Sequence, residues 1–340
     1  MSITFQDNNN LTYDQWRFLR KDSIGSSSVG VICFGSPYKC SLEIFYEKIS
    51  GITPSVDNIR TFLGKKTEPL SGEMWSYYEG SPDSIIKNYN AGTPVKKGEN
   101  RNVTIFNSKF PGRSTTPDIH ILPFGEYEGR GEGYCEIKNT QSYILKSYND
   151  QLPPENVFQL CDQMIIGDKS YGELFYFLDN RDFVGYPLER KSMRNIEETI
   201  IRETGDLWKK ITEAKPLYNQ MINAKFNNNN RLANELDNEI QRLEPSPQYS
   251  TGYLNYLTLH YKDRISGVGI INGDEVALKI AKKHKQLSGQ LDKIKKEKQM
   301  REIELRLILK ANNCIDFGKL GKVTHFPTSA GNRLLKNNLK

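Results

Sequence analysis

The stretch Thr115–Thr140 constrains the fold of this 340-residue chain more than any other part of it. It reads TTPDIHILPFGEYEGRGEGYCEIKNT, with two β-type runs on either side of a glycine-rich turn region. Side chains alternate along a strand, so Glu136 and Lys138 share one face, and a hairpin returns Asp118 beside them. Two carboxylates and one ammonium on one sheet face are costly to bury, and a divalent metal ion would relieve that cost. The stretch therefore predicts a metal centre on a β-hairpin.

Phosphodiester hydrolysis is the chemistry that these side chains suit. It needs charge neutralisation on the phosphate and a nucleophilic water at neutral pH, and a bound Mg²⁺ or Mn²⁺ ion supplies both. Such ions prefer carboxylate and carbonyl oxygens, so the expected ligands are Asp118, Glu136 and the carbonyl of Ile137. Glu68, on a preceding helix, is expected as an outer ligand or as a ligand of a second ion. Lys138 is expected to orient or deprotonate the attacking water, or to stabilise the developing charge.

This D…ExK pattern is short, and an ordinary charged strand is an equally open interpretation of it when it stands alone. Other hydrolytic centres have less support, because the four histidines lack zinc-ligand spacing and no nucleophile elbow is present. The five cysteines are scattered without CxxC pairs, which argues against a disulfide framework, a structural zinc site and an iron–sulfur cluster. The net charge of +6 permits a polyanionic partner without requiring one.

The apolar patterning also indicates where the chain works. No apolar run approaches the length that spans a bilayer. The first ten residues, MSITFQDNNN, lack the apolar core of a secretory signal. We therefore expect no membrane association and a cytoplasmic location.

β-type runs at residues 101–110, in the hairpin and at 173–190 alternate with helical patterns. Strands flanked by helices predict an α/β or α+β domain at residues 12–226, after a disordered lead at residues 1–11. Residues 227–252 hold an asparagine run, a polar helix and a Pro-Ser stretch, and are expected to form a linker.

Residues 253–340 are expected to form a helical, coiled-coil-like extension with a short terminal β-ribbon. Ile280, His284, Leu287, Leu291 and Ile294 follow a 3-4 spacing, with lysines on the other faces. The simplest interpretation is a helix or helical hairpin that packs on a partner helix and exposes a solvated lysine face. Duplex binding by that face is the less favoured alternative.

A Gly-Ser-Ser-Ser turn at Gly25–Ser28 leads into an apolar run. The backbone N–H groups of such a turn, its serine hydroxyls and the nearby Arg20 are suited to hold a phosphate. A plain serine-capped helix explains the same residues.

Several segments taken together resemble the YqaJ-type viral recombinases, the family of lambda exonuclease within the PD-(D/E)xK nuclease superfamily. They are WRFLRKDSIGSSS, GKKTEP, TPD, CEIK and FQLCDQM, and they occur in the family's order over roughly residues 12–215. The resemblance implies a restriction-endonuclease-like central mixed sheet flanked by helices.

The resemblance also assigns roles to residues. It places Asp118, Glu136 and Lys138 on the family's catalytic triad, Glu68 on its additional acid and Gln159 on the glutamine of the helix behind the site. It places Arg20 and Ser27 in the pocket that binds a 5′-phosphate, with Ser26 in the same loop and Thr116 where a serine often contributes.

The activity implied by the resemblance is a Mg²⁺-dependent 5′→3′ exonuclease on the ends of linear double-stranded DNA. Such enzymes leave 3′ single-stranded tails for a single-strand annealing protein in phage or viral recombination. Members form homo-oligomeric rings, some of them trimeric. The alternatives are an endonuclease or single-strand nuclease on the same core, or a catalytically silent DNA-binding scaffold.

Overall fold

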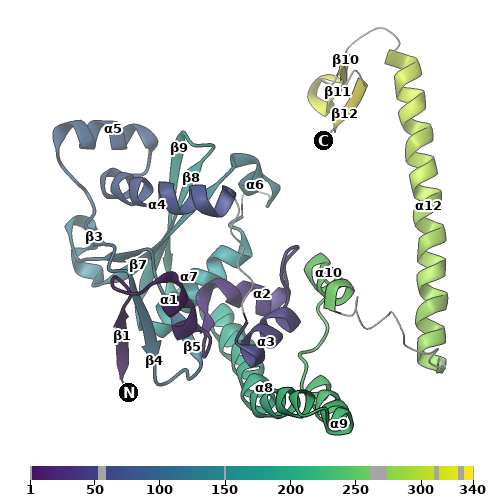
Figure 1. Cartoon of the computed structure of the whole chain (residues 1–340). Coiled ribbons are helices and arrows are strands. Elements are labelled where there is room, and N and C mark those ends of the chain that lie inside the picture. Colours follow the sequence, from purple (N-terminus) through teal and green to yellow (C-terminus); the bar gives the residue numbers. More distant parts are fainter. Residues whose placement is uncertain are drawn as a thin grey trace. The chain divides into compact units, whose positions relative to one another are not determined.

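The computed structural model describes residues 2–52, 59–148, 151–260, 274–309, 314–327 and 333–339. The chain divides into two compact units, Met1–Ile265 and Ser266–Lys340. The first unit contains two sheets flanked by helices (Figure 1). The expected α+β fold with a mixed sheet is confirmed. Within the described ranges, no helix combines the length and the apolar character that a membrane crossing requires.

The five-stranded sheet carries the opening hairpin at its centre. Its order is β3-β6-β7-β8-β9, and only the pair β7 and β8 is parallel, which makes the sheet mixed. The strands are β3 (Gly98–Glu99), β6 (Ile119–Ile121), β7 (Gly133–Thr140), β8 (Tyr171–Leu178) and β9 (Asp182–Glu189). All eight residues of β8 are buried, because this strand is covered on both faces.

Helices cover both faces of this sheet (Figure 1). On one face, Tyr134 and Tyr176 pack against residues of α7 (Pro154–Ile166) and α8 (Arg194–Phe226). On the other face, Cys135 and Phe175 pack with residues of α4 (Ile59–Tyr77) and α5 (Pro82–Ala91). The alternation along β7 therefore directs Glu136 and Lys138 toward α7, as the strand period predicts.

The four-stranded sheet has the order β1-β4-β5-β2. Its strands are β1 (Ile3–Asp7), β2 (Ile24–Gly25), β4 (Val103–Asn107) and β5 (Arg113–Thr115). Strands β2 and β5 are parallel neighbours, which matters for the site because each is followed directly by a loop with polar side chains.

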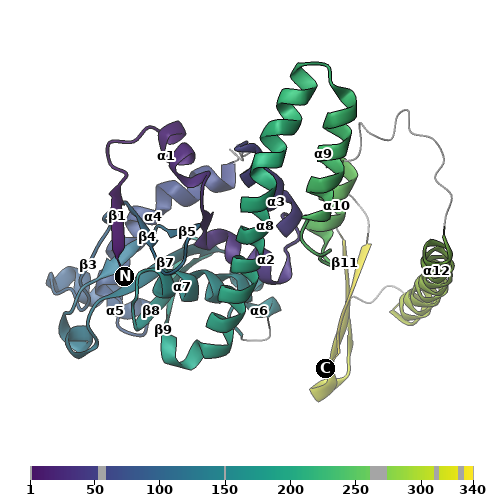
Figure 2. The same ribbon diagram turned by 90° about the horizontal axis from the view of Figure 1, so that it is seen from below.

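The remaining helices of the first unit form a helical layer beside α8. Buried residues of α2, α3, α8, α9 and α10 form one apolar cluster, and Figure 2 shows α9 running alongside α8. The bounds are α1 (Tyr13–Arg20), α2 (Val29–Phe34), α3 (Ser41–Ser50), α6 (Ser142–Ser147), α9 (Asn230–Arg242) and α10 (Thr251–His260). Short 3₁₀ helices span Ser26–Ser28, Gly125–Arg130, Arg190–Met193 and Gly318–Leu320.

Two sequence expectations need correction. The supposed disordered lead at residues 1–11 contains β1, which pairs antiparallel with β4 from Ile3↔Asn107 to Asp7↔Val103. Part of the supposed linker at residues 227–252 packs into the first unit, because Ala233, Leu236 and Ile240 give α9 an apolar stripe that α8 covers.

In its described residues, the second unit contains the 35-residue helix α12 (Glu275–Leu309) and a three-stranded sheet. The strands are β10 (Cys314–Asp316), β11 (Gly321–Pro327) and β12 (Arg333–Leu339). The division between units falls at Ile265 and Ser266, later than the expected boundary near residue 252. Residues 261–273 of the expected extension lie outside the described residues.

Candidate functional site

Strand pairing brings Asp118 to the Glu136-Ile137-Lys138 segment. β6 begins one residue after Asp118 and pairs antiparallel with β7, so that Ile119 lies opposite Cys135. An Asp118 Oδ2 atom accepts a hydrogen bond from the Ile137 N–H at 2.7 Å. The hairpin therefore assembles the three charged residues that the sequence predicts together.

Glu136 lies at the centre of a polar cluster and is 4% exposed. Its Oε1 atom accepts from Lys138 Nζ at 2.7 Å and from Gln159 Nε2 at 2.6 Å. Its Oε2 atom accepts from Gln163 Nε2 at 2.5 Å. Three donors to one buried carboxylate fix its orientation.

Lys138 is tied into the same cluster, because its Nζ atom also donates to Gln159 Oε1 at 2.9 Å. Burial acts to lower the pKa of Lys138, but the negative charges of Glu136 and Asp118 raise it overall. Lys138 is therefore an ammonium at neutral pH, which favours charge stabilisation over proton abstraction among its expected roles.

Glu68 approaches the hairpin from α4. A cavity of about 370 Å³ is lined by Glu68, Asp118 and Thr116 among others. Burial and the negative charge of Glu136 raise the pKa of Glu68, and burial together with Glu136 and Glu68 raises the pKa of Asp118 well above its usual range. Both carboxylates thus face a shared cavity in which a positive ion would stabilise their charged forms.

The donor set fits a hard divalent cation, which prefers carboxylate oxygens. In the described part of the chain, no three His, Cys, Asp or Glu side chains are grouped tightly enough to hold an ion together. At Glu136, both carboxylate oxygens accept hydrogen bonds from Lys138 and the two glutamines. Asp118 and Glu68 are the carboxylates that line the cavity, and Ile137 contributes its N–H to Asp118.

The loop Ser26–Ser28, called the serine loop below, lies at the same sheet edge as the segment between β5 and β6 that contains Asp118. β2 pairs parallel with β5, with Ile24 opposite Arg113 and Gly25 opposite Ser114. The carboxyl ends of parallel strands meet at one edge, so Ser26–Ser28 and Thr116 both emerge there. The Thr116 hydroxyl contacts that of Thr104 at 3.2 Å, and Thr116 also lines the cavity with Asp118.

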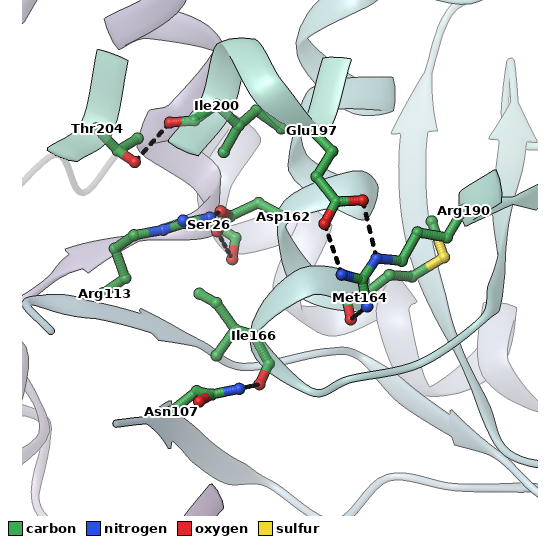
Figure 3. A network of polar contacts seen from close by, with 10 residues as sticks. All are labelled: Ser26, Asn107, Arg113, Asp162, Met164, Ile166, Arg190, Glu197, Ile200 and Thr204. Carbon is green, nitrogen blue, oxygen red and sulfur yellow. Dashed lines mark hydrogen bonds and ion pairs between the residues drawn. The ribbon is translucent and has the colours of Figure 1, made fainter. Parts of the chain in front are cut away.

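Ser26 differs from its expected role as a phosphate contact. It is 3% exposed, and its hydroxyl donates to Asp162 Oδ2 at 2.6 Å. Figure 3 shows Ser26 and Arg113 meeting at Asp162, with which Arg113 forms a buried ion pair. Ser26 therefore fastens the loop to α7, whereas Ser27 is exposed at the surface.

Arg20 lies against this loop from the end of α1. Its guanidinium stacks on the Trp16 ring, 4.5 Å from the centroid, and lies so close to Gly25 that a Cβ there would overlap it. Lys48 Nζ donates to the Arg20 carbonyl at 2.8 Å. Burial and the Arg20 charge lower the pKa of Lys48 to about 8. Two positive side chains, Arg20 and Lys48, therefore lie beside the loop that the sequence predicts to bind a phosphate.

The sequence left three supporting residues without a role: Gln163, Asp162 and Arg113. The i, i+4 spacing of Gln159 and Gln163 does place both on one helix face, which here faces Glu136. A carboxylate inside the apolar run LCDQMII was the available signal for Asp162. Its partners lie 136 and 49 residues away along the chain, and a single sequence does not show such pairings.

Comparison with known proteins finds a similarity over the part of the chain that contains these residues. Residues 15–170 match the model of the YqaJ-like viral recombinase domain. No curated protein matches the chain. Among solved structures, an alkaline exonuclease (LHK-Exo) from Laribacter hongkongensis is 15% identical, with 61% of this chain and 98% of that chain covered and a TM-score of 0.43. A phage related exonuclease from Haemophilus somnus 129PT is 11% identical, with 56% and 95% covered and a TM-score of 0.36.

The family match contains both loops and the whole hairpin, from Arg20 through Glu136 to Gln163. Family and site chemistry together support a nuclease role. Residues 15–170 of this chain are therefore similar to the YqaJ-like viral recombinase domain.

Proposed function

We propose that the chain is a Mg²⁺-dependent exonuclease that digests one strand of linear double-stranded DNA from its 5′ end and leaves a 3′ single-stranded tail. The observation that carries this proposal is the cluster of Asp118, Glu136 and Lys138 on one hairpin, next to Glu68. These carboxylates and this ammonium suit phosphodiester hydrolysis assisted by a hard divalent ion.

The division of labour follows from the contacts. A Mg²⁺ ion held by Asp118 and Glu68 at their shared cavity, with Glu136 as the neighbouring carboxylate, would neutralise phosphate charge and make water nucleophilic at neutral pH. Gln159 and Gln163 orient the Glu136 carboxylate through its two oxygens. The Lys138 ammonium, fixed by Glu136 and Gln159, is placed to stabilise the charge that develops on the phosphate.

Selection of the end is assigned to Arg20 and Ser27, with Thr116 at the same edge. Arg20 supplies a guanidinium that suits a terminal phosphate, whose two negative charges exceed the single charge of an internal phosphodiester. Lys48 adds a second cation beside it. The expected annealing partner and the ring-shaped homo-oligomer stay predictions that follow from the family resemblance.

The first test compares three DNA substrates with Mg²⁺ or with EDTA. Linear duplex with a 5′-phosphate should be digested fastest, linear duplex without it more slowly, and circular duplex not at all. EDTA or Asp118→Ala should reduce digestion by at least about 10³-fold, because both remove charge stabilisation at the reacting phosphate.

Asp206→Ala, which removes an exposed carboxylate on α8, is the matched control and should digest DNA like the unchanged protein. Cleavage of the circle would make the chain an endonuclease. Digestion in EDTA would exclude the metal mechanism.

A second test addresses the phosphate pocket. Arg20→Ala should slow digestion of 5′-phosphorylated ends roughly tenfold to a hundredfold and leave 5′-hydroxyl ends nearly unchanged, since one charge-assisted contact is lost. Lys21→Ala removes the neighbouring cation, which stacks on Phe18, and should preserve the preference for phosphorylated ends. Equal losses on both kinds of end would remove Arg20 from the pocket.

A further inference from the structure

The positive charge of this chain is concentrated in its second unit. Of the 47 lysine and arginine residues, 16 lie in Ser266–Lys340, together with only 7 of the 41 aspartate and glutamate residues. That unit therefore carries a formal charge of +9, and Met1–Ile265 carries −3. The unit that contains the nuclease site is thus not the one whose net charge attracts a polyanion.

Helix α12 presents much of this charge on one side. Five lysines lie within an arc of about 120° at 100° per residue. This lysine face consists of Lys279, Lys282, Lys285, Lys293 and Lys296, all exposed. It extends over roughly 26 Å along the helix axis at 1.5 Å per residue, a length that covers several phosphates of a DNA backbone.

The lysine face is available to a ligand. Among the residues that the structure describes, the ion pairs within α12 are Arg301–Glu304 and Arg306–Glu302, near its C-terminal end. The apolar stripe of Ile280, Leu287, Leu291 and Ile294 lies on the opposite side of the helix. The two sides are therefore distinct, and a ligand on the lysines leaves the stripe uncovered.

We propose that the lysine face binds the phosphates of duplex DNA and tethers the substrate to the chain while the first unit works at its end. The inference rests on the proposed function for the identity of the substrate. Duplex DNA fits because it carries about one charge per 1.7 Å of axis, the highest charge density among the strands involved. A lipid surface fits less well, because α12 contains no Trp, Phe or Tyr to insert beside its lysines.

Tethering would keep the substrate bound between successive cleavages by an enzyme that shortens it. Each cleavage removes the nucleotide that the site was holding. Contacts made by another part of the same chain keep the DNA at a high effective concentration and favour the next cleavage over release.

The test uses the full chain with all five lysines of the lysine face changed to Gln, which keeps helix propensity and removes five charges. The matched control is Lys87→Gln, Lys191→Gln, Lys209→Gln, Lys225→Gln and Arg231→Gln, which removes five exposed charges from the first unit. Circular dichroism verifies that both variants keep their helix content.

Equilibrium binding to a blunt duplex is measured in EDTA between about 50 and 200 mM salt, where cleavage does not interfere. Full loss of five phosphate contacts would reduce the slope of log K against log salt by about 4.5. We expect a reduction of about 3 to 4 for the lysine-face variant, with affinity lowered at least tenfold, and less than about 1 for the control.

Equal slopes for the two variants would overturn the proposal. So would a loss confined to a single-stranded oligonucleotide, or to phosphatidylserine-containing vesicles, because the partner would then not be duplex DNA. Digestion of the same duplex in Mg²⁺ is scored separately. Failure of the unchanged protein to digest DNA would remove the proposed function, whereas the slopes in EDTA would still decide the role of the lysine face.

Discussion

At the scale of single residues, the contacts around Arg20 place two positive side chains beside the serine loop. The Arg20 guanidinium lies against Gly25, and the Lys48 ammonium donates to the Arg20 carbonyl. Two cations this close repel each other, and Lys48 is half-buried, so its charged form is disfavoured in the folded protein. An arriving phosphate would stabilise both charges, which makes the strain useful at a binding site.

This arrangement predicts that Lys48 lowers the stability of the folded chain and increases its preference for 5′-phosphorylated ends. The pKa of Lys48 falls to about 8 in the folded chain, so the unfolded chain binds more protons between pH 8 and the ordinary lysine pKa. The penalty for Lys48 is therefore fully present below pH 8 and is lost as the pH rises through this window. Lys48→Met should raise the free energy of unfolding by about 1 kcal/mol at pH 7, after allowance for the lost hydrogen bond.

Urea unfolding at pH 7 and pH 9.5 measures this effect. The stability gain from Lys48→Met should be smaller at pH 9.5 than at pH 7. In the digestion assay, the same variant should prefer 5′-phosphorylated ends less than the unchanged protein does. A gain that is the same at both pH values would show that the charge of Lys48 is not its cause.

At the scale of elements, α7 joins the two halves of the site. One side of the helix orients Glu136 through Gln159 and Gln163, and Asp162 holds the serine loop through Ser26 and β5 through Arg113. The carboxylate cluster around Glu136 and the serine loop are therefore both fixed to the same helix. A displacement of α7 would move both.

The ion pair in this connection predicts a large stability effect. Burial lowers the pKa of Arg113 to about 10, yet Asp162→Ala would leave its charge buried without a partner. We expect the free energy of unfolding to fall by about 3 to 5 kcal/mol, and the double variant Asp162→Leu with Arg113→Met to recover most of this loss.

Urea unfolding of the three proteins checks the prediction, with Ser26→Ala as a control. That control removes one hydrogen bond, so it should cost about 1 kcal/mol and leave the preference for 5′-phosphorylated ends intact. A double variant as unstable as the single one would show that packing rather than charge explains the loss.

The elements also show what the sequence reveals by itself. The hairpin, α7 and the Lys138–Glu136 proximity follow from local periodicity, because strand and helix spacing decide which side chains share a face. β1 does not follow, because four of its five residues are exposed and backbone pairing with β4 rather than an apolar pattern holds it in place. The sequence also does not show the hydrogen-bond partner of the Ser26 hydroxyl, because that partner, Asp162, lies far along the chain.

At the scale of the whole molecule, the two units divide chemistry and charge between them. The first contains the site and all three apolar clusters built around its sheets and helices, and its net charge is −3. The second contributes a long helix with separate lysine and apolar sides. A whole-chain charge of +6 conceals this division, which explains why composition alone only permitted a polyanionic partner.

The burial of α7 has a consequence for how this chain can vary. Every residue from Leu160 to Ile166 is buried, so this half of the helix offers no solvent-facing position that tolerates arbitrary replacement. Asp162 and Arg113 in particular can change only as a pair, because either charge alone is a liability. We therefore expect substitutions to accumulate less in α7 than on exposed surfaces such as α12. Changes on such surfaces can alter binding without disturbing the buried core of the first unit.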